Sequence, residues 1–211
     1  MRILGLTGSI GMGKSVAAAQ LRLLGVPVHD ADKAVHRALG RGGAAVAAVG
    51  AAFPGSVMAG AVDRRRLGRL VFGNPAALKR LEAILHPLVR RSTRAFLAAS
   101  ARRRAPLVAL DIPLLFETGA ERRCDAVVVV TAPAFLQRQR VMRRPGMDAA
   151  RLSSVLARQL PDALKRRHAD HVVWSGLGRR PTLVSLARVA RRMKRRGQHV
   201  WGPGFERNRG R

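Results

Sequence analysis

The sequence predicts an α/β fold in which a parallel five-stranded sheet lies between layers of helices. The first observation is that short apolar runs, each the length of one buried strand, alternate with longer helical stretches. The second is a glycine-rich loop that joins the first apolar run to the first helix, as in nucleotide-binding sheets. The expected strands are residues 3–7, 26–29, 106–110, 124–131 and 169–174.

The first strand leads into Gly-Ser-Ile-Gly-Met-Gly-Lys-Ser at residues 8–15, which fits the phosphate-binding loop of P-loop nucleotidases. A helix over residues 16–24 follows and ends at Gly25, so the motif has the strand and the helix that it needs. Glycines let the backbone fold around an anion, and a helix N-terminus adds N–H donors and partial positive charge. A glycine-rich turn that binds nothing is disfavoured by this context. We therefore expect a three-layer P-loop nucleotidase core.

This loop and the start of its helix form the predicted nucleotide site. We expect Lys14 to contact the β- and γ-phosphates of ATP, and the Ser15 hydroxyl to bind Mg²⁺. The nucleotide-binding residues predicted in this segment are Gly8, Gly11, Met12, Gly13, Lys14, Ser15 and Val16.

The composition is that of a globular protein: the chain has 211 residues, of which 47% are hydrophobic, which suits one domain with an inserted lobe. No apolar run is long enough to span a membrane, and the N-terminus lacks the features of a secretory signal. Cys124 is the only cysteine, so an intrachain disulfide is excluded. These features together predict a cytoplasmic protein.

The net charge of +28, from 40 lysines and arginines against 12 acidic residues, is unusually high. Such a charge concentrates polyanions, so nucleic acid and a phosphate-rich small substrate are both candidate partners. Heavy use of arginine on a solvated surface is a third explanation, and charge alone does not choose among them. Much of the excess lies in short basic runs, at residues 102–104, 165–167, 191–192 and 194–196.

The second strand ends at Asp30-Ala31-Asp32, on the rim of the sheet where ligands bind in open α/β folds. An aspartate before a helix commonly caps that helix, which explains Asp30 without any catalytic role. A kinase that acts on a hydroxyl needs an acceptor for the proton, and an aspartate near the γ-phosphate serves this purpose. From the residues alone, both roles stay open for this pair.

The region from Lys33 to Ala101 has a helical pattern and no strand pattern, which predicts a helical lobe inserted between the second and third strands. A helix over residues 44–53 ends at a Pro-Gly turn, and Asp63 is expected to cap the next helix. A longer helix follows over residues 76–100. Pro87 should kink or split it, because proline removes one helix hydrogen bond and clashes with the preceding turn.

The third strand closes on Asp111, which resembles the second acidic motif of P-loop enzymes, whose carboxylate holds Mg²⁺ directly or through water. Residues 133–160 form an arginine-rich helical pair with a Pro-Gly break at residues 145–146, which is either a solvated face or a lid over the phosphates. A last helix over residues 183–196 has an apolar stripe and a basic face, and it is expected to pack on the sheet.

The order of these features resembles the dephospho-CoA kinase family, whose members phosphorylate the ribose 3′-hydroxyl of dephospho-CoA in the last step of coenzyme A synthesis. The resemblance extends from residue 3 to about residue 175. It is carried by the phosphate loop with residues 6–15, Asp-Ala-Asp at 30–32 with His36, Leu-His-Pro at 85–87, Asp-Ile-Pro-Leu-Leu-Phe-Glu at 111–117, Gln137, Arg140, Arg144, and Ala-Asp at 169–170.

The resemblance implies an ATP- and Mg²⁺-dependent kinase in which Asp32 is the base for the ribose hydroxyl. It also implies that Arg140, a lid arginine, contacts the ATP phosphates, with Arg144 as a second nucleotide ligand. The substrate-binding residues that it implies are Asp32, His36, His86, Pro87 and Glu117, although a buried, hydrogen-bonded His86 is an equal alternative. Two departures are Val16, where the family often has threonine, and Ser175, where asparagine is common, which leaves the adenine contacts open.

The resulting domain prediction has a nucleotide-binding core of residues 1–32, 104–136 and 161–196. The CoA-substrate lobe is residues 33–103, the lid is residues 137–160, and residues 197–211 are a basic, flexible tail. The expected partners are ATP and dephospho-CoA, with non-specific polyanion binding through the basic C-terminal segment, no membrane, and a monomer or small homo-oligomer. The alternatives are another small-molecule P-loop kinase, for a nucleoside monophosphate or a polyol, and a basic nucleic-acid-binding P-loop protein.

Overall fold

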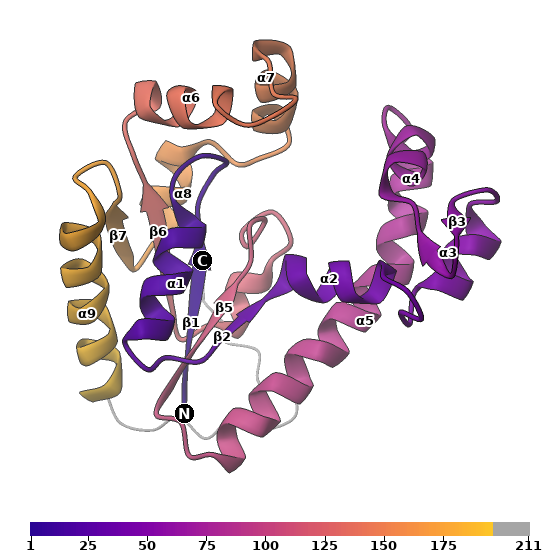
Figure 1. Ribbon diagram of the computed structural model, residues 1–211. Helices are drawn as coiled ribbons and strands as arrows, with labels where there is room; N and C mark the ends of the chain where they lie inside the picture. Colours follow the sequence, from indigo (N-terminus) through magenta and orange to yellow (C-terminus); the bar gives the residue numbers. More distant parts are fainter. Residues whose placement is uncertain (196–211) are drawn as a thin grey trace. The chain divides into compact units, whose positions relative to one another are not determined.

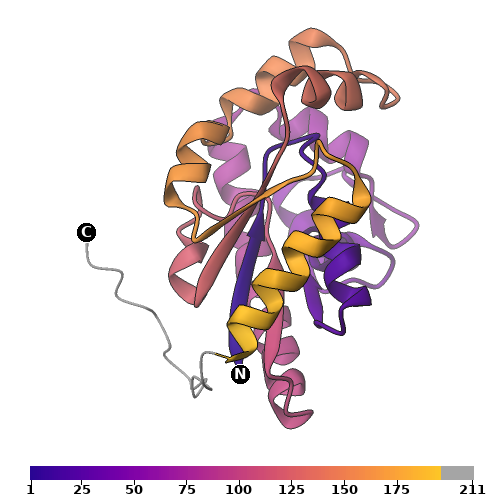
Figure 2. The ribbon, with the colours of Figure 1, turned by 90° about the vertical axis from the view of Figure 1, so that its left-hand side faces the viewer.

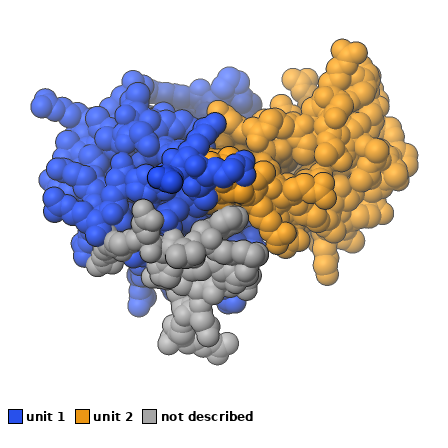
Figure 3. All heavy atoms as spheres, turned by 90° about the horizontal axis from the view of Figure 1, so that it is seen from below, with its two compact units in different colours: residues 1–29, 100–211 blue, residues 30–99 orange. Residues whose placement is uncertain are grey.

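A computed structural model describes residues 1–195 of the chain, so the basic tail predicted at residues 197–211 lies outside the described residues. The chain divides into two compact units, which Figure 3 shows in blue and orange. The first unit is made of residues 1–29 and the chain from Ser100 onward, and the second is residues 30–99. Each unit is described below by itself.

The first unit is built on a five-stranded sheet with the strand order β2-β5-β1-β6-β7 (Figure 1). Strand β1 pairs in parallel with β5 and β6, and β6 pairs in parallel with β7. The strands are β1 (Arg2–Thr7), β2 (Val28–Asp30), β5 (Leu107–Asp111), β6 (Ala126–Thr131) and β7 (His171–Trp174). The predicted fold class is thus confirmed, and the strand ends lie within two residues of the predicted ones.

Two helices, α1 (Lys14–Leu23) and α9 (Arg179–Arg195), cover one face of this sheet (Figure 2). Because side chains alternate along a strand, Leu4 and Leu6 of β1 both point to this face, together with Val128 of β6. They pack against Leu21 of α1, and the cluster extends to Leu186 of α9. An apolar core therefore holds together β1 and α1, the two elements that the phosphate loop joins.

The other helices of this unit come between β5 and β7 in the order of the chain. They are a short 3₁₀ helix (Ala120–Arg123), α6 (Ala134–Met142), α7 (Ala149–Ala157) and α8 (Asp162–His168). The break between α6 and α7 contains Pro145 and Gly146, as predicted, and Gly146 has a positive φ of 74°. Helix α9 begins four residues earlier than predicted, since its first turn accommodates Pro181, which lacks the N–H that a first turn leaves unpaired.

The second unit has its own apolar core, lined by residues such as Val49, Phe53, Leu67 and Leu81. Its elements are α2 (Ala31–Leu39), α3 (Val46–Ala52), β3 (Val57–Met58), β4 (Ala61–Val62), α4 (Arg64–Val71) and most of α5 (Pro75–Arg102). The prediction that this region has no strands is wrong, because β3 and β4 form an antiparallel hairpin. Its two turn residues, Ala59 and Gly60, have φ values of 47° and 75°, as a tight hairpin turn requires.

Helix α5 runs unbroken through Pro87, so the proline does not split it as the sequence suggested it could. Leu81 before the proline is buried in the core of the second unit, and Leu88 after it packs against the same core. Packing on both sides of the proline offsets the lost backbone hydrogen bond. None of the described helices is long and apolar enough to cross a membrane.

Candidate active site

The phosphate loop connects β1 to α1, and three of its glycines are required by its geometry. A Cβ atom on Gly8 would lie 2.5 Å from the carbonyl oxygen of Val130 on the neighbouring strand β6. Gly11 and Gly13 have φ values of 78° and 89°, and a residue with a Cβ atom adopts such values only at a cost in conformational energy. Gly13 is also the N-cap of α1, and its carbonyl accepts from the backbone N–H groups of Val16 and Ala17.

Several amides of this loop are available to an anion. Within the described residues 1–195, no hydrogen bond engages the backbone N–H groups of Gly11, Gly13, Lys14 or Ser15. These groups surround the start of α1, where the helix dipole adds partial positive charge. The loop therefore has N–H donors that the oxygens of a phosphate chain could accept from, and no side chain of residues 1–195 already accepts from them.

Lys14 and Asp111 form a short ion pair beside this loop. The ammonium Nζ of Lys14 lies 2.6 Å from Oδ1 of Asp111, and the Asp111 side chain is only 3% exposed. Asp111 ends β5, and Lys14 begins α1, so two elements far apart in sequence bring these groups together. The predicted phosphate-binding lysine and the predicted acidic magnesium ligand thus belong to one site.

Arg140 of α6 is held over the phosphate loop by Ser175, which follows β7. Its Nη1 donates to Ser175 Oγ at 2.9 Å and to the Gly11 carbonyl at 3.4 Å, while its Nη2 donates to the Ser175 carbonyl at 3.1 Å. Ser175 Oγ in turn donates to the Met12 carbonyl at 2.7 Å. The structure therefore shows a contact of Ser175 that sequence reasoning missed: this residue joins Arg140, in the predicted lid, to the phosphate loop.

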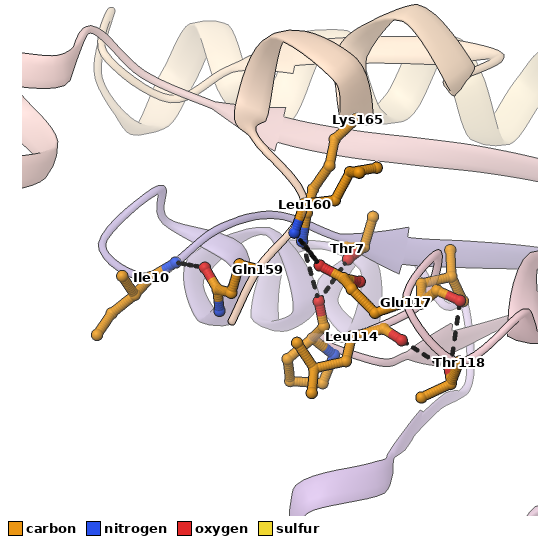
Figure 4. A network of polar contacts seen from close by, with 10 residues as sticks. Thr7, Ile10, Leu114, Glu117, Thr118, Gln159, Leu160 and Lys165 are labelled. Atoms are coloured by element: carbon orange, nitrogen blue, oxygen red, sulfur yellow. Dashed lines mark hydrogen bonds and ion pairs between the residues drawn. The ribbon is translucent and has the colours of Figure 1, made fainter. Parts of the chain in front are cut away.

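Two glutamines also connect the predicted lid to the phosphate loop, at the same residue. Gln137 of α6 donates its amide to the carbonyl of Ile10 at 2.8 Å. Gln159, near the end of the lid, accepts from the backbone N–H of Ile10 at 3.1 Å (Figure 4). Both ends of the lid segment are therefore attached to the loop, which no spacing in the sequence indicated.

Four of the predicted substrate-site residues lie in the second unit. Asp30 caps α2 by accepting from the Lys33 amide at 2.9 Å, which confirms the capping role, while Asp32 is exposed in the first turn of that helix. His36 lies farther along α2, with its Nε2 at 2.8 Å from Nη1 of Arg64. His86 and Pro87 are exposed on α5, so the alternative of a buried His86 is wrong.

The remaining predicted residues lie in the first unit. Val16 is 39% exposed in the first turn of α1, and Arg144 is exposed just after α6. Glu117 lies in the loop after β5, where its Oε1 is 2.9 Å from Nζ of Lys165 and accepts from the Leu160 amide at 2.7 Å. Substrate binding by Glu117 stays a prediction, and these contacts assign the carboxylate a second role that is developed below.

No group of three or more histidine, cysteine, aspartate or glutamate side chains among residues 1–195 could hold a metal ion by itself. Mg²⁺ in phosphoryl-transfer enzymes is held differently, by one or two protein oxygens together with substrate phosphates and water. Ser15 and Asp111 offer that donor set, a hydroxyl at the start of α1 and a carboxylate at the end of β5. The residues present therefore fit a magnesium ion that arrives with ATP.

The sequence profile described as dephospho-CoA kinase matches residues 2–176, which is most of the chain and all of the site above. The chain belongs to the dephospho-CoA kinase family. A dephospho-CoA kinase of Rhodospirillum rubrum is 58% identical over 208 residues, covering 95% of this chain and 99% of its own. Another of Paramagnetospirillum magneticum is 69% identical over 166 residues, covering 79% of this chain and 78% of its own.

Solved structures agree with the fold. A crystal structure from Thermus thermophilus is 40% identical, with a TM-score of 0.80 over 90% of this chain and 96% of that one. A dephospho-CoA kinase from Campylobacter jejuni shares the fold, at 22% identity and a TM-score of 0.61 over 91% and 97% of the two chains. The predicted family, the assignment as a kinase and the predicted function are confirmed, and they are favoured over the other P-loop kinases and over nucleic-acid binding.

Proposed function

We propose that the site described above transfers the γ-phosphoryl group of ATP to the ribose 3′-hydroxyl of dephospho-CoA. The observation that carries the assignment of roles is the convergence of Lys14, Asp111 and Arg140 on one phosphate loop. Phosphoryl transfer of this kind needs no covalent bond to the enzyme, so positioning of the substrates and neutralisation of charge supply most of the catalysis. This loop offers backbone donors, two cations and a carboxylate for that purpose.

The residues divide the reaction among them. Asp32 accepts the proton as the ribose oxygen forms its bond to the γ-phosphorus, and the bond from that phosphorus to the leaving oxygen of ADP breaks. Lys14 stabilises the β- and γ-phosphates, and Arg140 stabilises the charge on the transferred group. Ser15 and Asp111 would hold Mg²⁺, which neutralises phosphate charge when it is bound.

The two units suggest a division of labour. We assign nucleotide binding to the unit that contains the phosphate loop, and CoA binding to the unit of residues 30–99, with Asp32, His36, His86 and Pro87. We also assign residues 137–160 as the lid, and the contacts of Gln137 and Gln159 with Ile10 support this by connecting both ends of the segment to the phosphate loop. Cytoplasmic location and a monomer or small homo-oligomer remain predictions, and Cys124, the single cysteine of the sequence, is consistent with the first.

The first experiment measures ADP release from ATP and Mg²⁺ with dephospho-CoA, beside AMP, adenosine and shikimate as acceptors. Saturable turnover with dephospho-CoA alone supports the proposal, and turnover with another acceptor keeps the phosphate loop but discards this substrate. Omitting Mg²⁺ tests the metal. A product carrying its phosphate anywhere other than on the 3′ oxygen would contradict the proposed chemistry.

The role of Asp32 is tested by Asp32→Asn, which keeps the shape of the side chain but removes the proton acceptor. We expect kcat to fall by about 100- to 10,000-fold while ATP still binds, since only the base is altered. Asp30→Asn is the matched control, because asparagine also caps helices and Asp30 has no proposed chemical role. Near-normal turnover of Asp32→Asn would remove Asp32 from the mechanism.

We propose a second, weaker activity: the exposed surface of α9 binds polyanions without sequence preference. The helix carries no acidic residue, and its exposed cations are Arg179, Arg180, Arg188, Arg191, Arg192, Lys194 and Arg195. Binding of a short DNA duplex should fall steeply with salt, because released counterions dominate such affinity. A chain truncated after Arg196 separates α9 from the tail, and salt-independent binding by either form would contradict the proposal.

A further inference from the structure

Lys165 of α8 is the largest fully buried side chain in the described part of the protein. Its Nζ lies 2.9 Å from Oε1 of Glu117 and donates to the Pro113 carbonyl at 3.4 Å (Figure 4). Burying a cation is costly unless it is paired, and an apolar pair in the same place is often at least as stable. Stability alone therefore gives a weak reason for this pair, which raises the question of what it positions.

Glu117 holds the backbone at the end of the lid as well as the buried lysine. The same Oε1 accepts from the Leu160 amide at 2.7 Å, and the carboxylate side chain is 18% exposed. Leu160 is the last lid residue, directly before Pro161, the N-cap of α8. One carboxylate oxygen thus fixes the point at which the lid leaves and α8 begins.

This point is connected to the phosphate loop on both of its sides. Gln159, next to Leu160, accepts from the amide of Ile10 inside the loop at 3.1 Å. The Pro113 carbonyl that accepts from Lys165 also accepts from the hydroxyl of Thr7 at 2.9 Å, and Thr7 directly precedes the loop. All of these groups belong to the first unit, and Figure 4 shows them as one network.

We infer that Glu117 and Lys165 are positioning residues for ATP: they fix the end of the lid so that Gln159 holds the phosphate loop in its binding conformation. Neither residue needs to touch the nucleotide for this role. The path runs from Lys165 to Glu117, to the Leu160 amide, and through Gln159 to Ile10. The inference deepens the proposed function, and it concerns the affinity for ATP rather than the chemistry of transfer.

Removing Glu117 alone leaves a buried cation unpaired, which can unfold the protein, so the main test is a double variant. Glu117→Leu with Lys165→Met replaces the pair by apolar groups and also removes the acceptor for Leu160. We expect this protein to fold with a Tm close to that of the wild type. Its Kd for a non-hydrolysable ATP analogue should rise by about 10-fold.

The acceptor is tested separately by Glu117→Gln combined with Lys165→Met, which removes the buried cation together with its partner charge and keeps an amide oxygen that can accept from the Leu160 amide. This variant should keep the affinity for ATP within about threefold of the wild type, because the bond to the lid is preserved. Arg143→Ala, which removes an exposed charge just after α6, is the control and should leave Kd unchanged. Wild-type affinity for ATP in the variant with Glu117→Leu and Lys165→Met would mean that the pair is only structural, and would overturn the inference.

The path through Gln159 is tested by a double-mutant cycle. Gln159→Ala removes the acceptor for Ile10 and should weaken ATP binding by a similar factor on its own. Combined with Glu117→Leu and Lys165→Met, it should add little, because both changes interrupt the same path. Fully additive effects would contradict that path. The readout is binding of ATP analogue, so it stays meaningful even if dephospho-CoA proves not to be the acceptor.

Discussion

Lys14 and Asp111 are joined by a 2.6 Å ion pair between the first residue of α1 and the last residue of β5. The pair places the lysine that is proposed to bind phosphate beside the carboxylate that is proposed to hold Mg²⁺. An ammonium that is held by a carboxylate is already oriented toward the phosphate loop, so less side-chain entropy is lost when ATP binds. This relationship makes Asp111 a test of the site as a whole.

Asp111→Asn should lower kcat by about 10- to 100-fold and raise the Mg²⁺ concentration needed for half-maximal rate. Asparagine keeps an oxygen that can accept from Lys14 but lacks the negative charge that a hard cation prefers. The measurement is the initial rate against Mg²⁺ concentration at saturating ATP and dephospho-CoA. Glu82→Gln, an exposed carboxylate of α5, is the charge-matched control, and an unchanged Mg²⁺ dependence of Asp111→Asn would exclude a metal role.

The contact between Ser175 and Arg140 predicts two separable effects. Arg140→Ala should reduce kcat by about 1,000-fold, the size expected for an arginine that stabilises a transferring phosphoryl group. Ser175→Ala should raise the KM for ATP by only about 3- to 10-fold, since the bond from Nη2 to the backbone carbonyl remains. Steady-state kinetics distinguish these outcomes.

Arg140→Lys provides the control for geometry. Lysine keeps the positive charge but cannot make the two-pronged contact with Ser175, so it should recover little of the lost activity. Full activity of Arg140→Lys would show that charge suffices there and that the contact with Ser175 has no functional role.

Much of the first unit could be predicted from the sequence because buried parallel strands are continuous apolar runs, and β5 and β6 are examples. The polar groups of the site also followed from their position at strand ends, as with Asp111. The hairpin of β3 and β4 could not be predicted in the same way. Its strands have two residues each, too few for any periodicity, and its Ala-Gly turn lacks the usual asparagine or aspartate.

The contacts that hold the proposed lid could not be predicted from the sequence for a different reason. Lys165 lies in a run of three basic residues for which a solvated surface was one of three open explanations, yet its side chain is completely buried. Its partner Glu117 is 48 positions away, and no local pattern links a glutamate to a lysine at that distance. Gln159 and Ser175 are similar: generic polar residues acquire a role only when the fold brings them to the loop.

Gly8→Ala should destabilise the protein, because the added Cβ would lie 2.5 Å from the Val130 carbonyl. Backbone atoms cannot move aside as a flexible side chain can, so we expect a loss of about 1–3 kcal/mol in the free energy of unfolding. Denaturant titration measures it. Gly68→Ala is the matched control: that glycine lies in α4 with open space around its Cβ position, and alanine there should stabilise by about 0.5–1 kcal/mol.

The charge of Asp63 makes the stability of α4, in the second unit, depend on pH. The backbone N–H of Arg66, and to a smaller extent that of Arg65, hold the pKa of this carboxyl below its ordinary value of 3.8, although desolvation opposes them. A lowered pKa in the folded state means that the charged cap stabilises α4 fully above the unfolded pKa. That contribution is lost as the pH falls from about 4 through the folded pKa.

The test compares the wild type with Asp63→Asn between pH 7 and pH 3. Asparagine also caps helices but does not titrate, so the difference in Tm between the two proteins isolates the charge of Asp63. We expect the wild type to have the higher Tm at pH 7. The difference in Tm should shrink only below about pH 4, because the pKa of Asp63 is lowered in the folded state. A difference that stays constant down to pH 3, or one that grows, would show that the carboxylate form of Asp63 contributes nothing to α4.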